Sequence, residues 1–193
     1  QLTIEAGTSY YRRQQCGELV VPDELTAATM YEETQAILED AGLPAYEVSN
    51  HALPGRESRH NLNYWRYGDY AGIGPGAHGR ITSPKVKRAF RQIRGPEAWL
   101  SAVETKGHGA MNPQLLNSDE RLEEMLMMCL RLTEPLSIRR IEEETGDTFQ
   151  RMVDPDRLRQ LVDGGFLNLK NNELSSTAAG RQRLNAVLGQ LLI

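Results

Sequence analysis

The pattern of apolar and polar positions over the first 48 residues predicts a strand, a helix and a second strand. Residues 2–4 are β-prone and are followed by a polar loop. Asp23 is a typical N-cap for a helix, and Gly42 is a typical C-terminal stop. Residues 45–48 again favour a strand. We therefore expect a β-α-β unit with parallel strands, whose helix turns one apolar set inward: Ala27, Met30, Ile37, Leu38 and Ala41.

After this unit the pattern predicts two further strands and a short helix. Residues 70–73 favour a strand, and residues 85–90 alternate in the way of another. Pro96 begins a helix that ends at Gly107. Ligands bind beyond the carboxyl ends of parallel strands, so the segments expected to share one rim are 5–8, 49–51 and 74–79.

The remainder of the chain predicts a mainly helical domain. Its elements, in order, are a helix capped by Ser118, helices over 137–145 and 155–163, a hairpin of 166–169 with 173–175, and a last helix over 177–192. This order resembles a winged helix. We place the connection in residues 107–113, so the expected fold is an α/β domain over 1–110 and a mainly α domain over 114–193.

Charge argues against a nucleic-acid-binding protein. The chain has 193 residues, 25% of them charged, and a net charge of -4. Residues 118–193 contain ten Arg and Lys against thirteen Asp and Glu, so the basic surface expected of a DNA-binding winged helix is missing. We therefore expect no nucleic acid among the partners.

The cysteines argue against a metal centre built from this chain alone. Cys16 and Cys129 are the two cysteines, and no CxxC spacing occurs. This usage fits a reduced, cytoplasmic protein. No apolar run approaches the ~20 residues that cross a bilayer.

Residues 55–80 contain the highest density of side chains suited to binding a ligand. Their first half combines an imidazole, two carboxamides and two aromatic rings with polar tips, and their second half is rich in glycine. A single histidine or aromatic residue is more often structural than functional. The gathering of these groups in one window nevertheless favours a ligand site, with these candidates: His60, Asn61, Tyr64, Trp65 and His78.

A basic strand follows this window. Residues 80–94 contain six basic residues and no acidic one, and on a strand Lys85, Lys87 and Arg91 would share a face. That face could bind a carboxylate or a phosphate. A solvated edge strand protected by lysines is the alternative.

Four motifs together resemble the radical S-adenosylmethionine (SAM) proteins related to oxygen-independent coproporphyrinogen III oxidase. The HNxxYW pattern of residues 60–65 is similar to that of the haem-chaperone branch of this family. The motifs, in order, are LTIEAGT at 2–8, YEVSN at 46–50, SRHNLNYW at 58–65 and DYAGIGPGAHG at 69–79. Ala6 departs from the proline common in the family.

The resemblance implies a partial (β/α) barrel that holds a [4Fe–4S] cluster and SAM, followed by a winged-helix-like domain. The CxxxCxxC motif of the cluster is absent from this sequence, so the resemblance implies the C-terminal portion of a parent protein, with no metal ligands of its own. Such a portion should not cleave SAM by itself. By position, Thr3 and His78 would contact the adenosine end of SAM.

The resemblance also implies haem as a ligand or cargo, passed to acceptor proteins. Haem iron takes an axial imidazole, its propionates suit Arg or Lys, and its apolar face suits aromatic rings. His60 or His78 would serve the iron, and the basic strand the propionates. Tyr64 and Trp65 would cover the ring. Peripheral contact with membrane-bound acceptors stays open.

Two other functions stay open at this point. Both branches of the family share the barrel, so the chain could belong to a coproporphyrinogen III oxidase of porphyrin biosynthesis. It could also be an adaptor whose winged-helix-like tail binds a partner.

Overall fold

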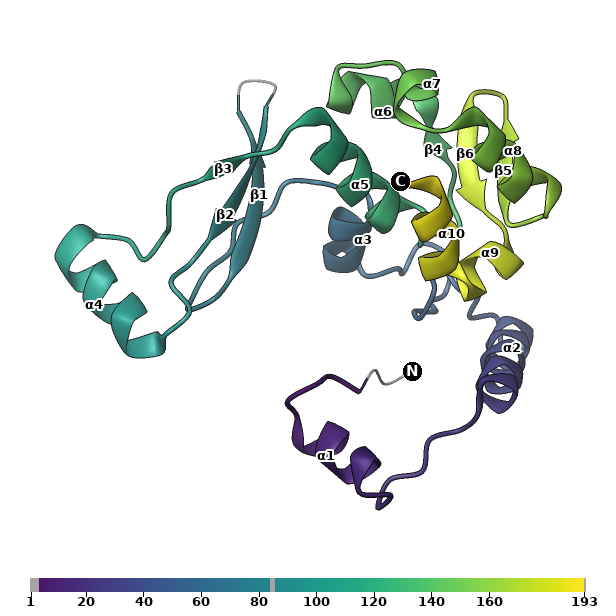
Figure 1. The fold of residues 1–193 in the computed structure, drawn as a ribbon, viewed down its shortest axis with the longest axis horizontal. Helices are drawn as coiled ribbons and strands as arrows, with labels where there is room; N and C mark the ends of the chain where they lie inside the picture. The colour runs from purple at the N-terminus through teal and green to yellow at the C-terminus, as the bar shows by residue number, and fades with distance from the viewer. Residues whose placement is uncertain (1–3, 84–85, 193) are drawn as a thin grey trace. The chain divides into compact units, whose positions relative to one another are not determined.

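The computed structural model describes residues 4–83 and 86–192 and divides the chain into two compact units, residues 1–57 and 58–193. This division differs from the boundary expected between residues 110 and 114, which stays a prediction. Figure 1 shows the elements along the chain. Thr3 and Lys85, both predicted site residues, lie outside the described residues.

The first unit contains α1 (Ser9–Gln15) and α2 (Glu24–Asp40). The predicted limits of α2 are confirmed, because the Asp23 carboxylate accepts a hydrogen bond from the Thr26 backbone N–H at 2.7 Å, and Gly42 takes a positive φ of 74° just beyond the helix. The helix α1 forms where a polar loop was expected.

The parallel pairing expected in this unit stays a prediction, because residues 2 and 3 of its first strand lie outside the described residues. Residues 45–48 form no strand, and Ala45 makes an isolated antiparallel bridge to His51 instead. A strand needs hydrogen-bonded neighbours along its length, and the two sheets of the described residues do not include this segment. Of the segment 2–4, only Ile4 is described, and it is not in a strand.

The second unit begins with α3 (Arg59–Trp65) and an antiparallel sheet of β1 (His78–Thr82), β2 (Lys87–Arg91) and β3 (Gln114–Leu115). The strand expected at 85–90 is confirmed from residue 87 onward. The strand expected at 70–73 is reduced to one bridge between Tyr70 and Arg80. Between β2 and β3 lies α4 (Pro96–Lys106), which ends at Gly107 as predicted.

The helical part of this unit confirms the predicted order of elements. It contains α5 (Ser118–Cys129), β4 (Leu136–Ser137), α6 (Ile138–Thr145), α7 (Phe149–Met152), α8 (Pro155–Asp163), β5 (Leu167–Lys170), β6 (Glu173–Ser176), α9 (Ala178–Gln182) and α10 (Leu184–Leu191). The strands β4, β6 and β5 pair antiparallel in that order. Some details differ: β4 and α7 were not predicted, Asn117 rather than Ser118 caps α5, and the last helix breaks at Arg183.

The core of the second unit lies among these helices. Met125 and Leu126 of α5 are fully buried with Ile141 of α6 and Leu174 of β6. The side chain of Met127, by contrast, is 45% exposed. It therefore lies on the face of α5 that the core leaves free.

Candidate functional site

The HNxxYW motif forms the short helix α3, which the sequence pattern did not predict. The Ser58 hydroxyl accepts a hydrogen bond from the Asn61 backbone N–H at 3.3 Å and caps its start. Tyr67 has a positive φ of 54° just after the helix and turns the chain. Seven residues with few apolar positions carry little helical periodicity, and the Ser58 cap was the available signal.

The aromatic residues of the motif form a cluster around Tyr64. The rings of His60 and Tyr64 meet edge to face, with centroids 4.8 Å apart. The Tyr70 ring packs on Tyr64 at 4.4 Å. His60 is exposed and Tyr64 is half-buried, so α3 presents an imidazole to solvent on an aromatic support.

Trp65 and Asn61 occupy less open positions on α3. Both are half-buried, and the Arg131 guanidinium lies 4.4 Å from the centre of the Trp65 ring. The Trp65 indole N–H is buried, and the described residues offer it no acceptor. Trp65 is therefore fixed against the helical part of the unit by its ring rather than by its polar tip.

His78 and Arg91 are brought together by the register of the sheet. They are direct partners across β1 and β2, and both are exposed. Among the described residues no carboxylate lies within ion-pair distance of Arg91. The register thus places a candidate histidine beside a candidate basic residue at this end of the hairpin.

Lys87 is not available for a ligand, contrary to expectation. Only 2% of its side chain is exposed. Its ammonium donates a hydrogen bond to the Tyr67 carbonyl at 2.8 Å, lies 3.8 Å from the centre of the Tyr67 ring, and is 3.5 Å from Asp69. Alternation along a strand places residues on faces but does not say which face is buried, and the carbonyl and carboxylate compensate the buried charge.

The glycines of the 69–79 motif serve the packing of the chain on itself. A Cβ on Gly72 would lie 2.2 Å from the His78 carbonyl oxygen, and one on Gly79 would lie 3.0 Å from the Gly72 nitrogen. The segment before β1 therefore lies directly against that strand. Gly74 takes a φ of 97°, which a residue with a side chain rarely adopts.

A cavity of about 420 Å³ lies in the second unit, between the sheet, α3 and α5. Tyr64, Arg91 and Met128 are among the residues that line it, with Arg80 and Glu124. The cavity thus joins a residue of the HNxxYW motif to a basic residue of β2. Sequence reasoning singled out Tyr64 and Arg91 but missed the contribution of α5, because contacts between distant segments leave no local pattern.

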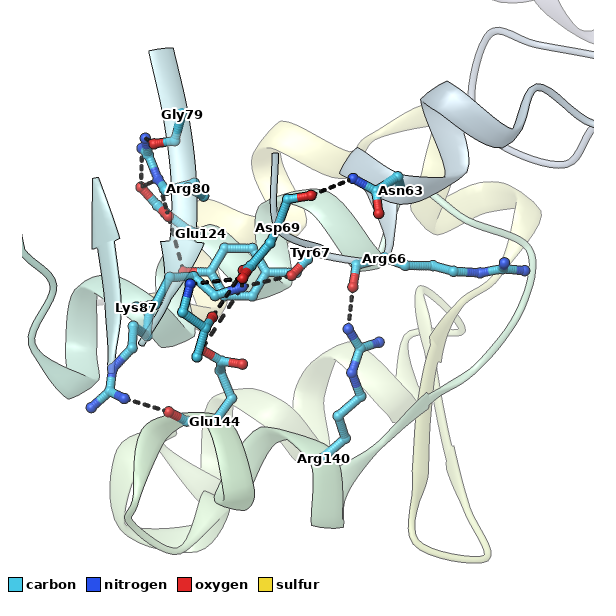
Figure 2. Close-up of polar contacts among 12 residues, drawn as sticks. Asn63, Arg66, Tyr67, Asp69, Gly79, Arg80, Lys87, Glu124, Arg140 and Glu144 are labelled. Atoms are coloured by element: carbon cyan, nitrogen blue, oxygen red, sulfur yellow. Dashed lines mark hydrogen bonds and ion pairs between the residues drawn. The ribbon is translucent and has the colours of Figure 1, made fainter. Parts of the chain in front are cut away.

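An ion pair at this cavity ties β1 to α5 (Figure 2). Arg80 donates to the two carboxylate oxygens of Glu124 at 2.6 and 2.9 Å, and the Tyr67 hydroxyl donates to the same group at 3.0 Å. Burial acts to raise the pKa of Glu124, but the hydrogen bonds and charge of Arg80 outweigh it and lower that pKa. Burial, together with the Glu124 charge, raises the pKa of Tyr67 well above its usual range. Tyr67 thus stays a hydrogen-bond donor at neutral pH.

The described residues do not form a binding site for an iron–sulfur cluster. No group of three or more His, Cys, Asp or Glu side chains among them could hold a metal ion. Cys16 is exposed and Cys129 is buried, and burial raises the pKa of the Cys129 thiol to about 11. A [4Fe–4S] cluster needs several thiolate ligands, so these residues do not fit it.

Comparisons with known proteins agree with the resemblance seen in the sequence. Residues 116–183 match the HemN C-terminal domain. The chain is 31% identical over 192 residues, 99% of its length, to the heme chaperone HemW of Bacillus subtilis. It is 34% identical over 199 residues to the zebrafish (Danio rerio) mitochondrial protein named radical S-adenosyl methionine domain-containing protein 1. The chain belongs to the HemW-type radical SAM family.

The match to this family covers the whole chain but only part of each relative. The chain spans about half the length of the curated relatives it matches, with 49% of the Bacillus protein and 45% of the zebrafish protein covered. The mouse homologue of the zebrafish protein is 46% identical over 135 residues. The predicted family is therefore confirmed.

A solved structure shows the same fold. Coproporphyrinogen III oxidase (HemN) from Escherichia coli, described as a radical SAM enzyme, matches 88% of this chain and 41% of its own length with a TM-score of 0.64. The identity is 17%, so this likeness concerns the fold alone.

Proposed function

We propose that this chain is part of a haem chaperone that binds haem and delivers it to acceptor proteins. The observation that carries the proposal is the similarity, over 99% of the chain, to proteins named heme chaperone HemW. The exposed imidazole of His60, held on a helix beside a cavity, supports it. A neutral imidazole is the usual protein ligand of haem iron.

Within this proposal, the site residues have separate roles. His60 is the axial ligand, with His78 as the alternative. Tyr64, together with Tyr70, supports the His60 ring and offers aromatic surface to the porphyrin. Arg91, unpaired in the described structure, receives a propionate at the cavity.

Trp65 and Asn61 stabilise α3 and do not contact the porphyrin in this proposal. The half-buried Trp65 ring fixes α3 through Arg131, and the Asn61 backbone closes the cap with Ser58. Lys87 no longer has a part in haem binding because it is buried, and Lys85 lies outside the described residues.

The parent protein would use SAM and a [4Fe–4S] cluster, as its relatives' names indicate for SAM. Contact of Thr3 and His78 with SAM stays a prediction. His78 is exposed at the start of β1, a position open to either ligand. We also propose that residues 1–110 complete the partial barrel and that residues 114–193 form the winged-helix-like domain.

The cellular location and the acceptor stay predictions. No helix among the described residues is long and apolar enough to cross a membrane. The relatives include bacterial proteins and proteins named mitochondrial, so a cytoplasmic location is one of two compartments to test.

A haem titration followed in the Soret region tests the proposal. We expect a saturable band for the wild-type chain and its loss or displacement in His60→Ala. His78→Ala serves as the test of the alternative ligand, and His108→Ala, which changes another exposed histidine, is the control. A band that is unchanged in both His60→Ala and His78→Ala would exclude these residues as ligands.

The role of Arg91 is tested with two porphyrins. A charge-assisted hydrogen bond to a propionate is worth about 1.5–3 kcal/mol, so Arg91→Ala should weaken haem binding about tenfold or more. Haem dimethyl ester lacks the propionate charges, so Arg91→Ala should bind it with the same affinity as the wild type does. Arg88→Ala, on the opposite face of β2, is the matched control. Equal losses with both porphyrins would contradict the assignment.

The coproporphyrinogen III oxidase reading rests on the shared fold, since the HNxxYW motif resembles the chaperone branch. Vinyl-group formation from coproporphyrinogen III by the complete parent protein would favour it. An adaptor role of the tail would be supported if its deletion abolished haem transfer, and a salt-dependent shift of random duplex DNA would favour nucleic-acid binding.

A further inference from the structure

The residues directly after α3 are held by the helical part of the unit. Arg66, the residue that caps the end of α3, donates to both carboxylate oxygens of Glu134 at 2.7 Å each. The Arg140 guanidinium of α6 donates to the Arg66 carbonyl (Figure 2). Arg66 is thus held both by its side chain and by its backbone carbonyl.

Tyr67 is buried and is held through its hydroxyl, its ring and its carbonyl. It is 5% exposed, its hydroxyl donates to Glu124 of α5, and the Lys87 ammonium contacts both its ring and its carbonyl. The hydroxyl bond joins α5 to the end of α3, over 57 residues of sequence. Figure 2 shows Tyr67 between Glu124 and Lys87.

These contacts matter because α3 is too short to keep its orientation without them. A helix of seven residues is far shorter than the ~12–15 residues at which isolated helices become even marginal. Its N-cap hydrogen bond is long, at 3.3 Å, and exposed. The contacts of Arg66 and Tyr67 therefore fix α3 from its C-terminal end, and with it the direction of the His60 side chain.

We propose that Tyr67, Glu124 and Glu134 are positioning residues through which the helical C-terminal part of the chain sets the orientation of α3 and so of the haem-binding His60. This inference rests on the proposed function. None of these residues touches the iron, and each acts through α3. The orientation of a metal ligand depends on such outer contacts, whose loss typically costs about 10–100-fold in metal affinity.

The test compares Tyr67→Phe and Glu134→Gln with Glu143→Gln. The first two remove one anchor each, whereas Glu143 forms an exposed pair with Arg139 inside α6. All variants are titrated with haem at a temperature where circular dichroism shows them folded. We expect Tyr67→Phe and Glu134→Gln to bind haem about tenfold more weakly with a displaced Soret band, and Glu143→Gln to match the wild type.

A merely structural role would lower the melting temperature but leave the spectrum and affinity of the folded protein unchanged, and this result would overturn the inference. Its failure differs from failure of the proposed function, in which the wild-type chain itself shows no His60-dependent band. Amide hydrogen exchange over residues 62–65 provides a haem-free check. Faster exchange in Tyr67→Phe than in Glu143→Gln supports the inference, and equal exchange contradicts it.

Discussion

At the scale of single residues, Lys87 is a buried charge whose environment compensates it. Asp69 and Glu144 lie 3.5 and 4.0 Å from its ammonium, and the Tyr67 carbonyl accepts a hydrogen bond from it. Although partial burial opposes the effect, hydrogen bonds from Thr82 and the Lys87 charge lower the pKa of Asp69. The lysine therefore belongs to the framework that holds the hairpin to the helices.

Removing this charge should destabilise the fold. Lys87→Met keeps the length of the side chain but leaves the Tyr67 carbonyl without its donor and Glu144 without this cation. An unsatisfied buried polar group costs about 1–3 kcal/mol, so urea denaturation should show a loss of about 2 kcal/mol in the free energy of unfolding. Lys106→Met, at an exposed position, should stay within about 0.5 kcal/mol of the wild type. Equal stability of the two variants would contradict the buried network.

The thiols should differ in reactivity. Cys129 is buried with a pKa raised by burial to about 11, whereas Cys16 is exposed. Because the thiolate is the reactive form, the native chain should release one equivalent of chromophore quickly with a disulfide reagent and the second only after denaturation. Two fast equivalents would show that the packing around α5 opens readily.

Residue patterns singled out several positions that the structure leaves exposed or places at a cavity. His60 and His78 are exposed and Tyr64 lines a cavity, as does Arg91 of the basic strand, and the ligand site expected from residues 55–80 stays a prediction. The burial of Lys87 could not be foreseen. Its partners come from segments up to 57 residues away, and no local pattern reports such contacts.

At the scale of elements, the segment before β1 depends on its glycines. Gly72→Ala would place a Cβ 2.2 Å from the His78 carbonyl oxygen, which is backbone and cannot rotate away. We expect a loss of about 2 kcal/mol or more in thermal or urea unfolding. Ala71→Ser, at the exposed neighbouring position, should be nearly neutral. A stable Gly72→Ala chain would mean that this segment does not lie against β1.

The tie between β1 and α5 should respond to acid. The pKa of Glu124 is lowered below its ordinary value of 4.5, so its contribution to stability is present above that pH and is lost as the pH falls through the folded pKa. The free energy of unfolding should thus decrease on acidification below about pH 4.5, and less steeply in Glu124→Gln than in the wild type. Identical pH profiles would contradict the ion pair with Arg80.

Capping residues explain which elements were predicted. Asp23, Gly107, Gly146 and Gly164 mark helix ends by local chemistry, and the helices α2, α4, α6 and α8 lie where expected. The short helices α1, α3 and α7 lack an apolar period. The strand expected at 45–48 is not formed as a continuous strand among the described residues, because strand pairing depends on neighbours far along the chain.

At the scale of the whole molecule, the chain belongs to a radical SAM family but lacks the cysteine motif that the resemblance requires for a cluster. Supplied with iron, sulfide, SAM and a reductant, it should form no 5′-deoxyadenosine above a protein-free control. Two cysteines cannot provide the three thiolates of CxxxCxxC. Stoichiometric 5′-deoxyadenosine would contradict this account of the chain.

The central claim is that α3 presents His60 to haem iron, and ligand replacement tests it most directly. In His60→Gly the haem spectrum should change, and added free imidazole should restore the wild-type Soret band by filling the space left by the side chain. The same addition to the wild-type complex should have little effect. A His60→Gly complex with the wild-type spectrum before imidazole is added would contradict the claim.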